Sequence, residues 1–378
     1  MFLSLSVSKR EKIIDFLKKE VVLIIATTLA LISSLISISQ IEYIDFKVLI
    51  LLFNLMIVVA AFKELKVLDW IATYLLYKCK TSISLSFTLV FLTFFASMLV
   101  TNDVALITFI PLSLVLGKKS NLNTLNLIVF QTLAANVGST LTPMGNPQNL
   151  FIYSYFNMSP FEFFKVTFPL TILSSFFLMI TLLMLKRKKL DVNLSKIEIK
   201  NFRHLIIWSI LFAIILLSVF QVINYKLAFI CTILVTLIIN KSLLKKIDYS
   251  LILTFIAFFI FIGNISNLDK VKTLMNTLLS DSSTTYFTSI ITSQFISNIP
   301  TTILLSPFTT FKDSLLLGVN IGGAGTLIAS LASVISYKLF IKENPSLSFK
   351  YLKSFTIYNI IYLIIFIPLI FILGSIFQ

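Results

Sequence analysis

The side chain that most strongly suggests a chemical role is Asp103, which lies in a long apolar stretch within Thr101-Asn102-Asp103. Of the 16 acidic residues, Asp103 alone lies deep in such a stretch. At the centre of a bilayer a carboxylate costs about 2.5–3.5 kcal/mol, and it is tolerated beside a wet cavity, a cation or a proton pathway. We therefore expect Asp103 to bind Na⁺ or a proton. The alternative is a carboxylate that only caps the helix beginning at Val104.

A second polar segment repeats the pattern around Asp103. The segment SQFISNIPTTILLSPF (293–308) aligns with SMLVTNDVALITFIPL (97–112), so that Ser297 matches Thr101. A chain reversal there would expose helix N-terminal N–H groups, which favour anions, and oxygen atoms, which suit a hard cation such as Na⁺. The alternative is that these side chains merely cap two helices. The tip residues expected to bind substrate or ion are Thr101, Asn102, Asp103, Ser297, Asn298, Pro300 and Thr301, with Na⁺ held near Asn102, Asp103 and Asn298.

Two further stretches interrupt apolar spans at matched positions. ANVGSTLTPMGNPQN (135–149) aligns with VNIGGAGTLIASLAS (319–333). Proline removes a backbone donor and glycine permits close approach or positive φ, so both favour a break in a helix. Unwound backbone at membrane depth is tolerated only inside protein or along a wet cavity. A simple packing kink, the alternative, would need only one such residue. The expected binding residues here are Asn136, Gly138, Ser139, Thr140, Thr142, Pro143, Asn146, Asn320, Gly322, Gly323, Gly325 and Thr326.

The composition of the chain determines which elements can position these residues. Of 378 residues, 57% are apolar and 12% are charged, against about 45–50% and about 25% in soluble proteins. The mean hydropathy of +0.99 agrees. A soluble enzyme, a disulfide scaffold and a disordered chain are excluded, and the sequence predicts an all-α polytopic membrane protein. With one His and two Cys, and without a P-loop, it indicates neither a metal cofactor nor direct use of ATP.

Apolar runs suggest nine crossings and two segments of a different kind. The segments 84–117 and 284–310 carry polar residues at their middle and are shorter than the about 40 residues that two spans need. We predict that both are re-entrant hairpins; the alternative is a pair of short, tilted full spans. The nine expected crossings are 20–38, 47–62, 123–149, 166–186, 204–222, 226–241, 251–266, 314–340 and 353–377.

Charge predicts the orientation of the chain. The formal charge of +15 would suggest nucleic acid in a soluble protein, but most of the 31 Lys and Arg residues fall in segments that lie inside if the N-terminus is inside. We therefore expect the N-terminus inside, the C-terminus outside and no nucleic-acid partner. No Lys or Arg falls among the expected binding residues, so we expect a central cavity without basic side chains.

These elements divide the chain into two halves. Five crossings separate the hairpins, and an odd number inverts the second copy, which is typical of secondary transporters. The predicted parts are an inner N-terminal segment (1–19), repeat 1 (20–186), a loop with a linker helix (187–225) and repeat 2 (226–378). The repeats contain the hairpins 84–117 and 284–310 and the interrupted helices 123–149 and 314–340, respectively.

The motifs resemble those of the ion transporter superfamily, more closely the citrate-transporter-like permeases that include arsenical-pump membrane proteins. The resemblance rests on Thr101–Leu106, Gly145–Asn149 and Ser297–Pro300. It implies inverted repeats and dimers in which one domain slides against another, in elevator fashion. In the family's dicarboxylate–sodium symporters each tip reads Ser-Asn-Thr. Here Asp103 and Ile299 depart from that pattern, and an acidic residue after Asn also resembles the arsenite-efflux and sodium/proton-antiporter branches.

The sequence therefore predicts a secondary active transporter in the plasma (inner) membrane. The expected substrate is a small anion, either a di- or tricarboxylate or an inorganic oxyanion, coupled to Na⁺ or H⁺ without another cofactor. The expected partners are the lipid bilayer and a second copy in a homodimer. The alternative is proton-coupled arsenite or antimonite efflux, or Na⁺/H⁺ antiport. A receptor that keeps the fold and a membrane-embedded enzyme are two further classes, and the absence of a recognisable nucleophile–base pair argues against the enzyme.

Overall fold

The computed structural model describes residues 20–120, 124–185, 187–189, 197–199 and 201–377. Within these ranges the regular structure is helical, apart from one isolated bridge between Thr81 and Lys189, so the all-α prediction is confirmed. The N-terminal segment 1–19 and most of the loop after residue 186 lie outside the described residues. The first half contains α2 (Val21–Ile36), η1 (Ile41–Tyr43), α3 (Phe46–Glu64), α4 (Val67–Leu76), α5 (Ser82–Val100), α6 (Asn102–Ser120), α7 (Thr124–Gly138), η2 (Ser139–Leu141), η3 (Pro143–Gly145), α8 (Pro147–Tyr155) and α9 (Pro160–Leu183).

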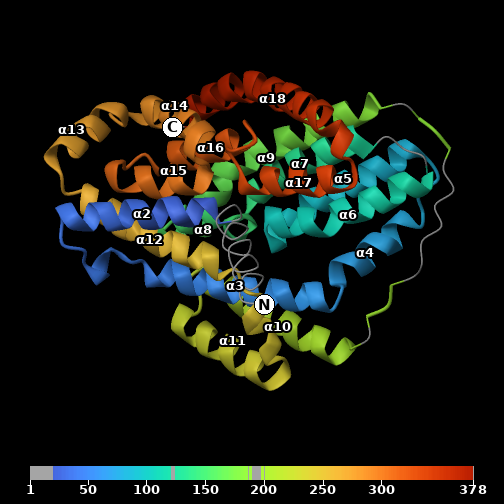
Figure 1. Ribbon diagram of the computed structural model, residues 1–378, viewed down its shortest axis with the longest axis horizontal. Helices are drawn as coiled ribbons and strands as arrows, with labels where there is room; N and C mark the ends of the chain where they lie inside the picture. The colour runs from blue at the N-terminus through green and yellow to red at the C-terminus, as the bar shows by residue number, and fades with distance from the viewer. Residues whose placement is uncertain (1–19, 121–123, 186, 190–196, 200, 378) are drawn as a thin grey trace, which may run out of the picture.

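The second half is built of the same kinds of element. It contains α10 (Phe202–Val219), α11 (Tyr225–Ile239), η4 (Lys241–Lys246), α12 (Tyr249–Ile265), α13 (Asp269–Leu278), α14 (Ser282–Ile296), α15 (Asn298–Leu305), η5 (Ser306–Phe308), α16 (Lys312–Gly323), α17 (Leu331–Glu343), η6 (Pro345–Leu347) and α18 (Ser348–Phe377). In Figure 1, α18 runs along one edge of the molecule, and α10 and α11 lie at the opposite edge.

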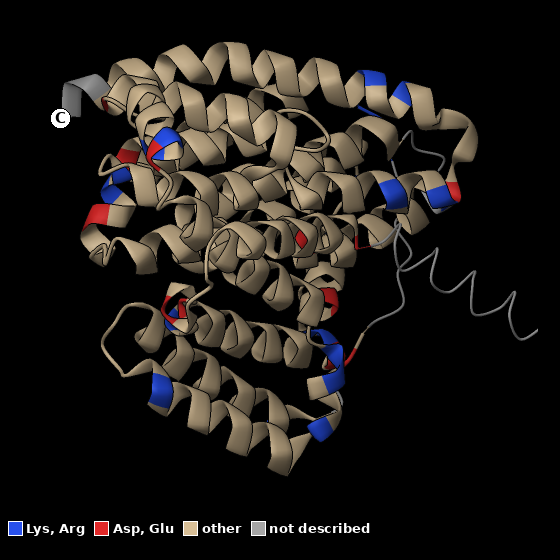
Figure 2. Cartoon of the chain, turned by 60° about the vertical axis from the view of Figure 1, so that its left-hand side comes forward, with Lys and Arg blue, Asp and Glu red and all other residues tan. Residues whose placement is uncertain are grey.

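Several helices have the length and composition of membrane spans. Among the described residues, α3, α5, α9, α10 and the stretch from η6 through most of α18 qualify, and a sixth span results if α12 and α13, bent by 104°, are counted as one. Helices α2, α4 and α11 are apolar but shorter. In Figure 2 most Lys, Arg, Asp and Glu residues lie toward helix ends and connections, as the bilayer requires. The structure therefore agrees with a multi-pass helical membrane protein.

The apolar side chains form large buried clusters. One cluster joins α2, α3, α8, α10, α12 and α15, and a second joins α5, α7, α9, α14 and α18. Helix α12 packs along α2, while α3 packs against α10 and α11. Helices α5 and α14 pack against α7 and α16, respectively. These contacts bring each expected hairpin beside its own interrupted helix.

Each expected hairpin turns on a single residue. Thr101 joins α5 to α6 with φ 76° and ψ 151°, and Ser297 joins α14 to α15 with φ 73° and ψ 157°. Non-glycine residues seldom adopt positive φ, and such conformations gather at functional sites. The first hairpin extends beyond the expected 84–117, over 82–120. In the second hairpin the returning helix α15 has only eight residues before η5.

The two expected interrupted helices are broken at matched places. The first is unwound between Gly138 and Pro147, and the second between Gly323 and Leu331. The expected end of the first at residue 149 is wrong, because α8 continues to Tyr155. Asn146 accepts a hydrogen bond from the Asn149 N–H and Pro147 occupies the first helical position, so the PQN sequence starts a new helix rather than ending the old one.

Candidate functional site

The first hairpin tip orders its own polar groups. The Thr101 hydroxyl donates to Asp103 Oδ1 at 2.5 Å, and Asn102 Oδ1 accepts from the Asp103 N–H at 2.9 Å. Asn102 is buried, whereas Thr101 and Asp103 are partly exposed. The side chain of Asp103 is therefore held by a neighbouring hydroxyl and remains partly exposed.

The second tip repeats the first turn and is tied to the second break. Asn298 Oδ1 accepts from the Ile299 N–H at 2.9 Å, as Asn102 does from Asp103. The Asn298 N–H donates to the Ala329 carbonyl at 2.9 Å, and the Ser297 hydroxyl donates to the same oxygen at 3.3 Å. Because Ile299 stands where Asp103 stands in the first tip, only the first tip presents a carboxylate.

Asn136 and Asn320 cross-link the two breaks reciprocally. Asn136, at the end of α7, accepts from the hydroxyl of Ser330, the last residue of the second break, at 3.0 Å, and donates to the hydroxyl of Ser333, in the first turn of α17, at 3.1 Å. Asn320, in α16, accepts from Asn146, the last residue of the first break, at 3.4 Å, and donates to Oδ1 of Asn149, in the first turn of α8, at 2.7 Å. In the alignment of the two stretches, Ser330 and Ser333 occupy the positions of Asn146 and Asn149.

One threonine in each break fastens that break to its hairpin, and it does so in the same way in both halves. The Thr142 hydroxyl donates to the Met98 carbonyl at 2.5 Å, and the Thr326 hydroxyl donates to the Gln294 carbonyl at 3.0 Å. Gln294 also accepts from the Thr326 N–H and donates to the Gly322 carbonyl. These hydroxyls are therefore used in holding unwound backbone against α5 and α14.

A cavity of about 630 Å³ opens beside the first tip. Of the expected binding residues, Thr101, Asp103 and Asn146 line it. Ser297 and Pro300 line a separate cavity of about 70 Å³. Asp248, at the start of α12, lines both.

The other expected residues lie around these cavities rather than in their walls. Asn102 donates to Asn136 at 3.2 Å, and Asn136 donates to the Gly323 carbonyl at 3.3 Å. A Cβ atom at Gly323 would lie 2.8 Å from Asn298 Nδ2, so this chain of contacts runs from one tip to the other. The remaining expected residues, absent from the linings of both cavities, are Gly138, Ser139, Thr140, Thr142, Pro143, Thr301, Asn320, Gly322, Gly325 and Thr326.

The expectation of a cavity without basic side chains is wrong. Lys63, Lys66 and Lys246 line the larger cavity, together with Glu64. They lie at the end of α3, at the corner before α4 and in η4, and the sequence indicates only that these are inner segments. Two corners of the chain bring them to the cavity that Thr101 and Asp103 also line, which hydropathy does not reveal.

The oxygen ligands in the cavity suit a hard cation or a proton. Among the described residues no group of three or more His, Cys, Asp and Glu side chains could hold a metal ion. The Asp103 carboxylate and the Thr101 hydroxyl offer oxygen atoms, which Na⁺ and similar cations prefer. Near the cavity, burial raises the pKa of the Asp69 carboxyl on α4, and the charges of Lys66 and Lys63 oppose that rise.

Comparison with known proteins identifies relatives. A family model described as citrate transporter matches residues 7–310. An uncharacterized transporter of Methanocaldococcus jannaschii is 35% identical over 299 residues, which cover 78% of this chain and 81% of the relative. The inner membrane protein YbiR of Escherichia coli is 30% identical over 64% of this chain and 66% of its own length. A Dictyostelium discoideum protein named as an arsB transporter is 29% identical over 43% of this chain and 28% of its own length.

Proposed function

We propose that this chain, which belongs to the citrate transporter family, is a secondary active transporter. It would move a small anion, coupled to Na⁺ or H⁺. The observation that carries the proposal is the 630 Å³ cavity, which is lined both by the Asp103 carboxylate and by three lysines. A cation and an anion bound in one cavity partly neutralise each other, and this mutual stabilisation is the physical basis of coupled transport.

Within this cavity we assign the coupling ion to Asp103. The Thr101 hydroxyl already donates to its carboxylate, so Na⁺ would draw oxygen ligands from both side chains. The anion would lie between this ion and the lysines. A di- or tricarboxylate or an inorganic oxyanion is the substrate class that such opposite charges favour.

The conformational change that we propose is an elevator movement of two inverted repeats in a homodimer of the plasma membrane. The matched turns at Thr101 and Ser297 support the repeats, as do the reciprocal bonds of Asn136 and Asn320. Interrupted helices facing each other at a central site are typical of such transporters. The cavity would be open to the inside in this structure, because Lys63 and Lys246 belong to predicted inner segments.

Proton-coupled efflux of arsenite, or Na⁺/H⁺ antiport, is the second candidate. Two observations favour it: an acidic residue follows Asn102 in the first tip, and one relative is named as an arsB transporter. In this case Asp103 would exchange protons, and no organic anion would be required.

The test is the transport current of the reconstituted protein on a solid-supported membrane. Citrate, succinate, sulfate and arsenite would each be applied with and without a Na⁺ gradient. We expect a cation-dependent current with at least one anion and its loss in Asp103→Asn, because the amide cannot carry the charge that binds the ion. Currents with arsenite or Na⁺ alone, accompanied by proton flux, would select the second candidate.

The matched control for Asp103→Asn is Asp269→Asn, which removes an exposed carboxylate at the start of α13, outside the cavity. We expect this variant to transport like the wild type. Normal coupled transport by Asp103→Asn would exclude the coupling role of Asp103, and both variants should insert and elute from size exclusion as the wild type does.

A further inference from the structure

Two corners of the chain contribute exposed charged side chains to the lining of the large cavity, and we call this solvent-facing part its mouth. Lys63, near the end of α3, and Lys66, which precedes α4, line it from one corner. Lys66 has φ 56° and ψ 34°, a left-handed conformation that few non-glycine residues adopt. Neither lysine forms an ion pair in the part of the chain that the structure describes. The other corner, from η4 to α12, contributes Lys246 and Asp248.

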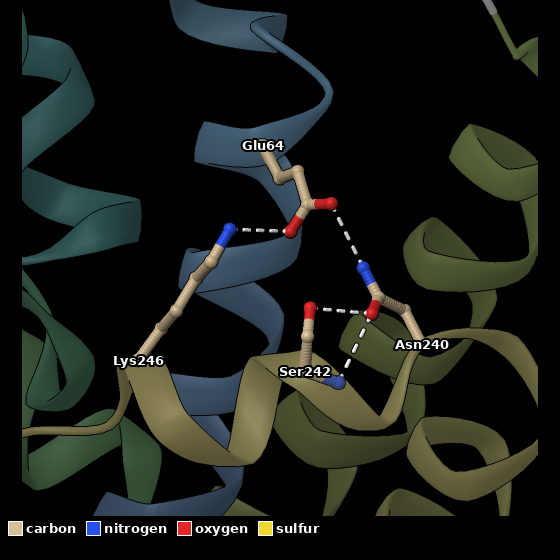
Figure 3. A network of polar contacts seen from close by, with 4 residues as sticks. All are labelled: Glu64, Asn240, Ser242 and Lys246. Carbon is tan, nitrogen blue, oxygen red and sulfur yellow. Dashed lines mark hydrogen bonds and ion pairs between the residues drawn. The ribbon is translucent and has the colours of Figure 1, made fainter.

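Lys246 differs from Lys63 and Lys66 because it already forms an ion pair with a carboxylate of the protein. Glu64 Oε2 lies 2.7 Å from Lys246 Nζ, and Asn240 Nδ2 donates to Glu64 Oε1 at 2.8 Å (Figure 3). Asn240 is itself fixed, because its Oδ1 accepts from the Ser242 N–H at 3.1 Å and from the Ser242 hydroxyl at 2.6 Å. The network thus holds the Glu64 carboxylate against an ammonium group that lines the cavity.

The ion pair of Glu64 with Lys246 is weak enough to be exchanged. Their side chains are 39% and 49% exposed, respectively, and exposed ion pairs contribute little because water and salt screen them. An incoming carboxylate or oxyanion presents the same type of acceptor as Glu64. Asp248 does not compete in the same way, since its Oδ1 accepts from the Leu251 N–H at 3.0 Å and caps α12.

We propose that Lys246 binds the transported anion at the mouth of the cavity, and that Glu64 is a built-in competitor which occupies Lys246 until the anion displaces it. This inference rests on the proposed function. Lys63 and Lys66 would first attract the anion, and Lys246 would then hold it on its way toward Asp103. The lysines would select charged over uncharged solutes, while Glu64 would keep weakly bound anions from filling the empty cavity.

The test removes the two partners of the ion pair separately and compares the KM for anions. Glu64→Gln keeps an oxygen that can accept from Asn240 but frees Lys246, so we expect the KM for the transported anion to fall about two- to fivefold. Lys246→Gln removes the binding group, and its KM should rise by at least the same factor. If the ion pair only stabilised the packing of α3 against η4, both substitutions would change KM in the same direction.

The matched control is Glu343→Gln, which breaks the exposed pair with Lys118 at 2.6 Å. Neither residue lines the cavity, so KM should stay at the wild-type value. Higher ionic strength should raise the wild-type KM for citrate, succinate or sulfate, because salt screens the lysines. Transport of arsenite, which is uncharged at neutral pH as arsenous acid, should respond to neither salt nor Lys246→Gln.

The outcomes separate this inference from the function on which it rests. Robust anion currents in the wild type with an unchanged KM in both variants, or with shifts in one direction, would overturn the role of Glu64 and Lys246 alone. A wild type that responds to none of the anions would overturn the proposed anion transport and, with it, the inference. Opposite shifts, with Glu343→Gln unchanged, would support it.

Discussion

At the scale of single residues, the side chain of Asn136 forms hydrogen bonds with more parts of the candidate site than any charged side chain does. Its amide connects the first tip, through Asn102, with the end of the second break and the start of α17, through Ser330 and Ser333. It is 5% exposed, so these hydrogen bonds are formed out of contact with water. A buried polar group that loses its partner keeps the full cost of desolvation. The position therefore specifies an amide, which both donates and accepts.

We predict that Asn136→Ala lowers the stability of the protein by about 1–3 kcal/mol, because it leaves buried partners without a hydrogen bond. The measurement is the apparent melting temperature in detergent, followed by fluorescence-detected size exclusion. Asn267→Ala is the control: Asn267 is exposed, so its loss should leave the melting temperature within error of the wild type. Equal melting temperatures for Asn136→Ala and the wild type would contradict the cross-link.

At the scale of elements, the fit of each interrupted helix against its hairpin depends on glycine. A Cβ atom at Gly138 would lie 2.3 Å from the Phe94 carbonyl oxygen of α5. One at Gly322 would lie 2.8 Å from the Ser293 Cβ of α14. It would also lie 3.1 Å from the Ile290 carbonyl oxygen. Gly138 aligns with Gly322 and Phe94 aligns with Ile290, so the same close approach occurs in both halves. Small residues allow helices in membranes to approach this closely.

We predict that Gly138→Ala destabilises the protein by about 1–3 kcal/mol or more, because a backbone oxygen, which cannot rotate away, lies where the methyl group would go. Gly374→Ala, at a position with nothing within 4 Å of an added Cβ, is the matched control and should be tolerated. Thermal unfolding and expression level would be compared for both. A Gly138→Ala protein as stable as the control would mean that α5 and α7 separate more easily than this packing indicates.

At the scale of the whole molecule, charge and hydropathy predict the orientation of the chain in the membrane. The pair of Lys118 with Glu343 lies at 2.6 Å, at the ends of α6 and α17. The pair of Lys312 with Glu162 lies at 3.3 Å, at the starts of α16 and α9. The predicted topology assigns the first pair to the inside and the second to the outside. The two hairpins would then open to opposite faces.

We predict that Lys118→Cys reacts with an impermeant thiol reagent only from the inside, and that Lys312→Cys reacts only from the outside. The native Cys79 and Cys231 would be replaced by Ser in the background protein. Each lysine forms only an exposed ion pair, so replacing it should lower the free energy of unfolding by at most about 1 kcal/mol. Labelling of both positions from the same face would contradict the inverted repeats.

Composition and local motifs are enough to predict the class of the protein and part of its local structure. Apolar content dictates helices in a bilayer, because only internal hydrogen bonds satisfy the backbone there. The proline and glycine residues predicted the chain breaks after Gly138 and Gly323, whereas the helices begin at Asn102, two residues before the expected start, and at Pro147, where the sequence predicted no new helix. The motifs around Thr101 and Ser297 also identified the citrate transporter family, which the comparisons confirm. The predictions of inverted repeats, nine crossings and binding residues remain to be tested.

The contacts between distant side chains follow from the packing of the helices. The partners of Asn136 lie in another part of the chain, and hydropathy carries no information on contacts between distant segments. Lys63 and Lys246 read as ordinary inner-loop residues, yet the corners after α3 and η4 bring them to the cavity of Asp103. Local propensity depends on neighbours in sequence, whereas a binding cavity depends on how helices pack. For that reason the sequence predicted a candidate site at Thr101 and Asp103 but missed the lysines that line the same cavity.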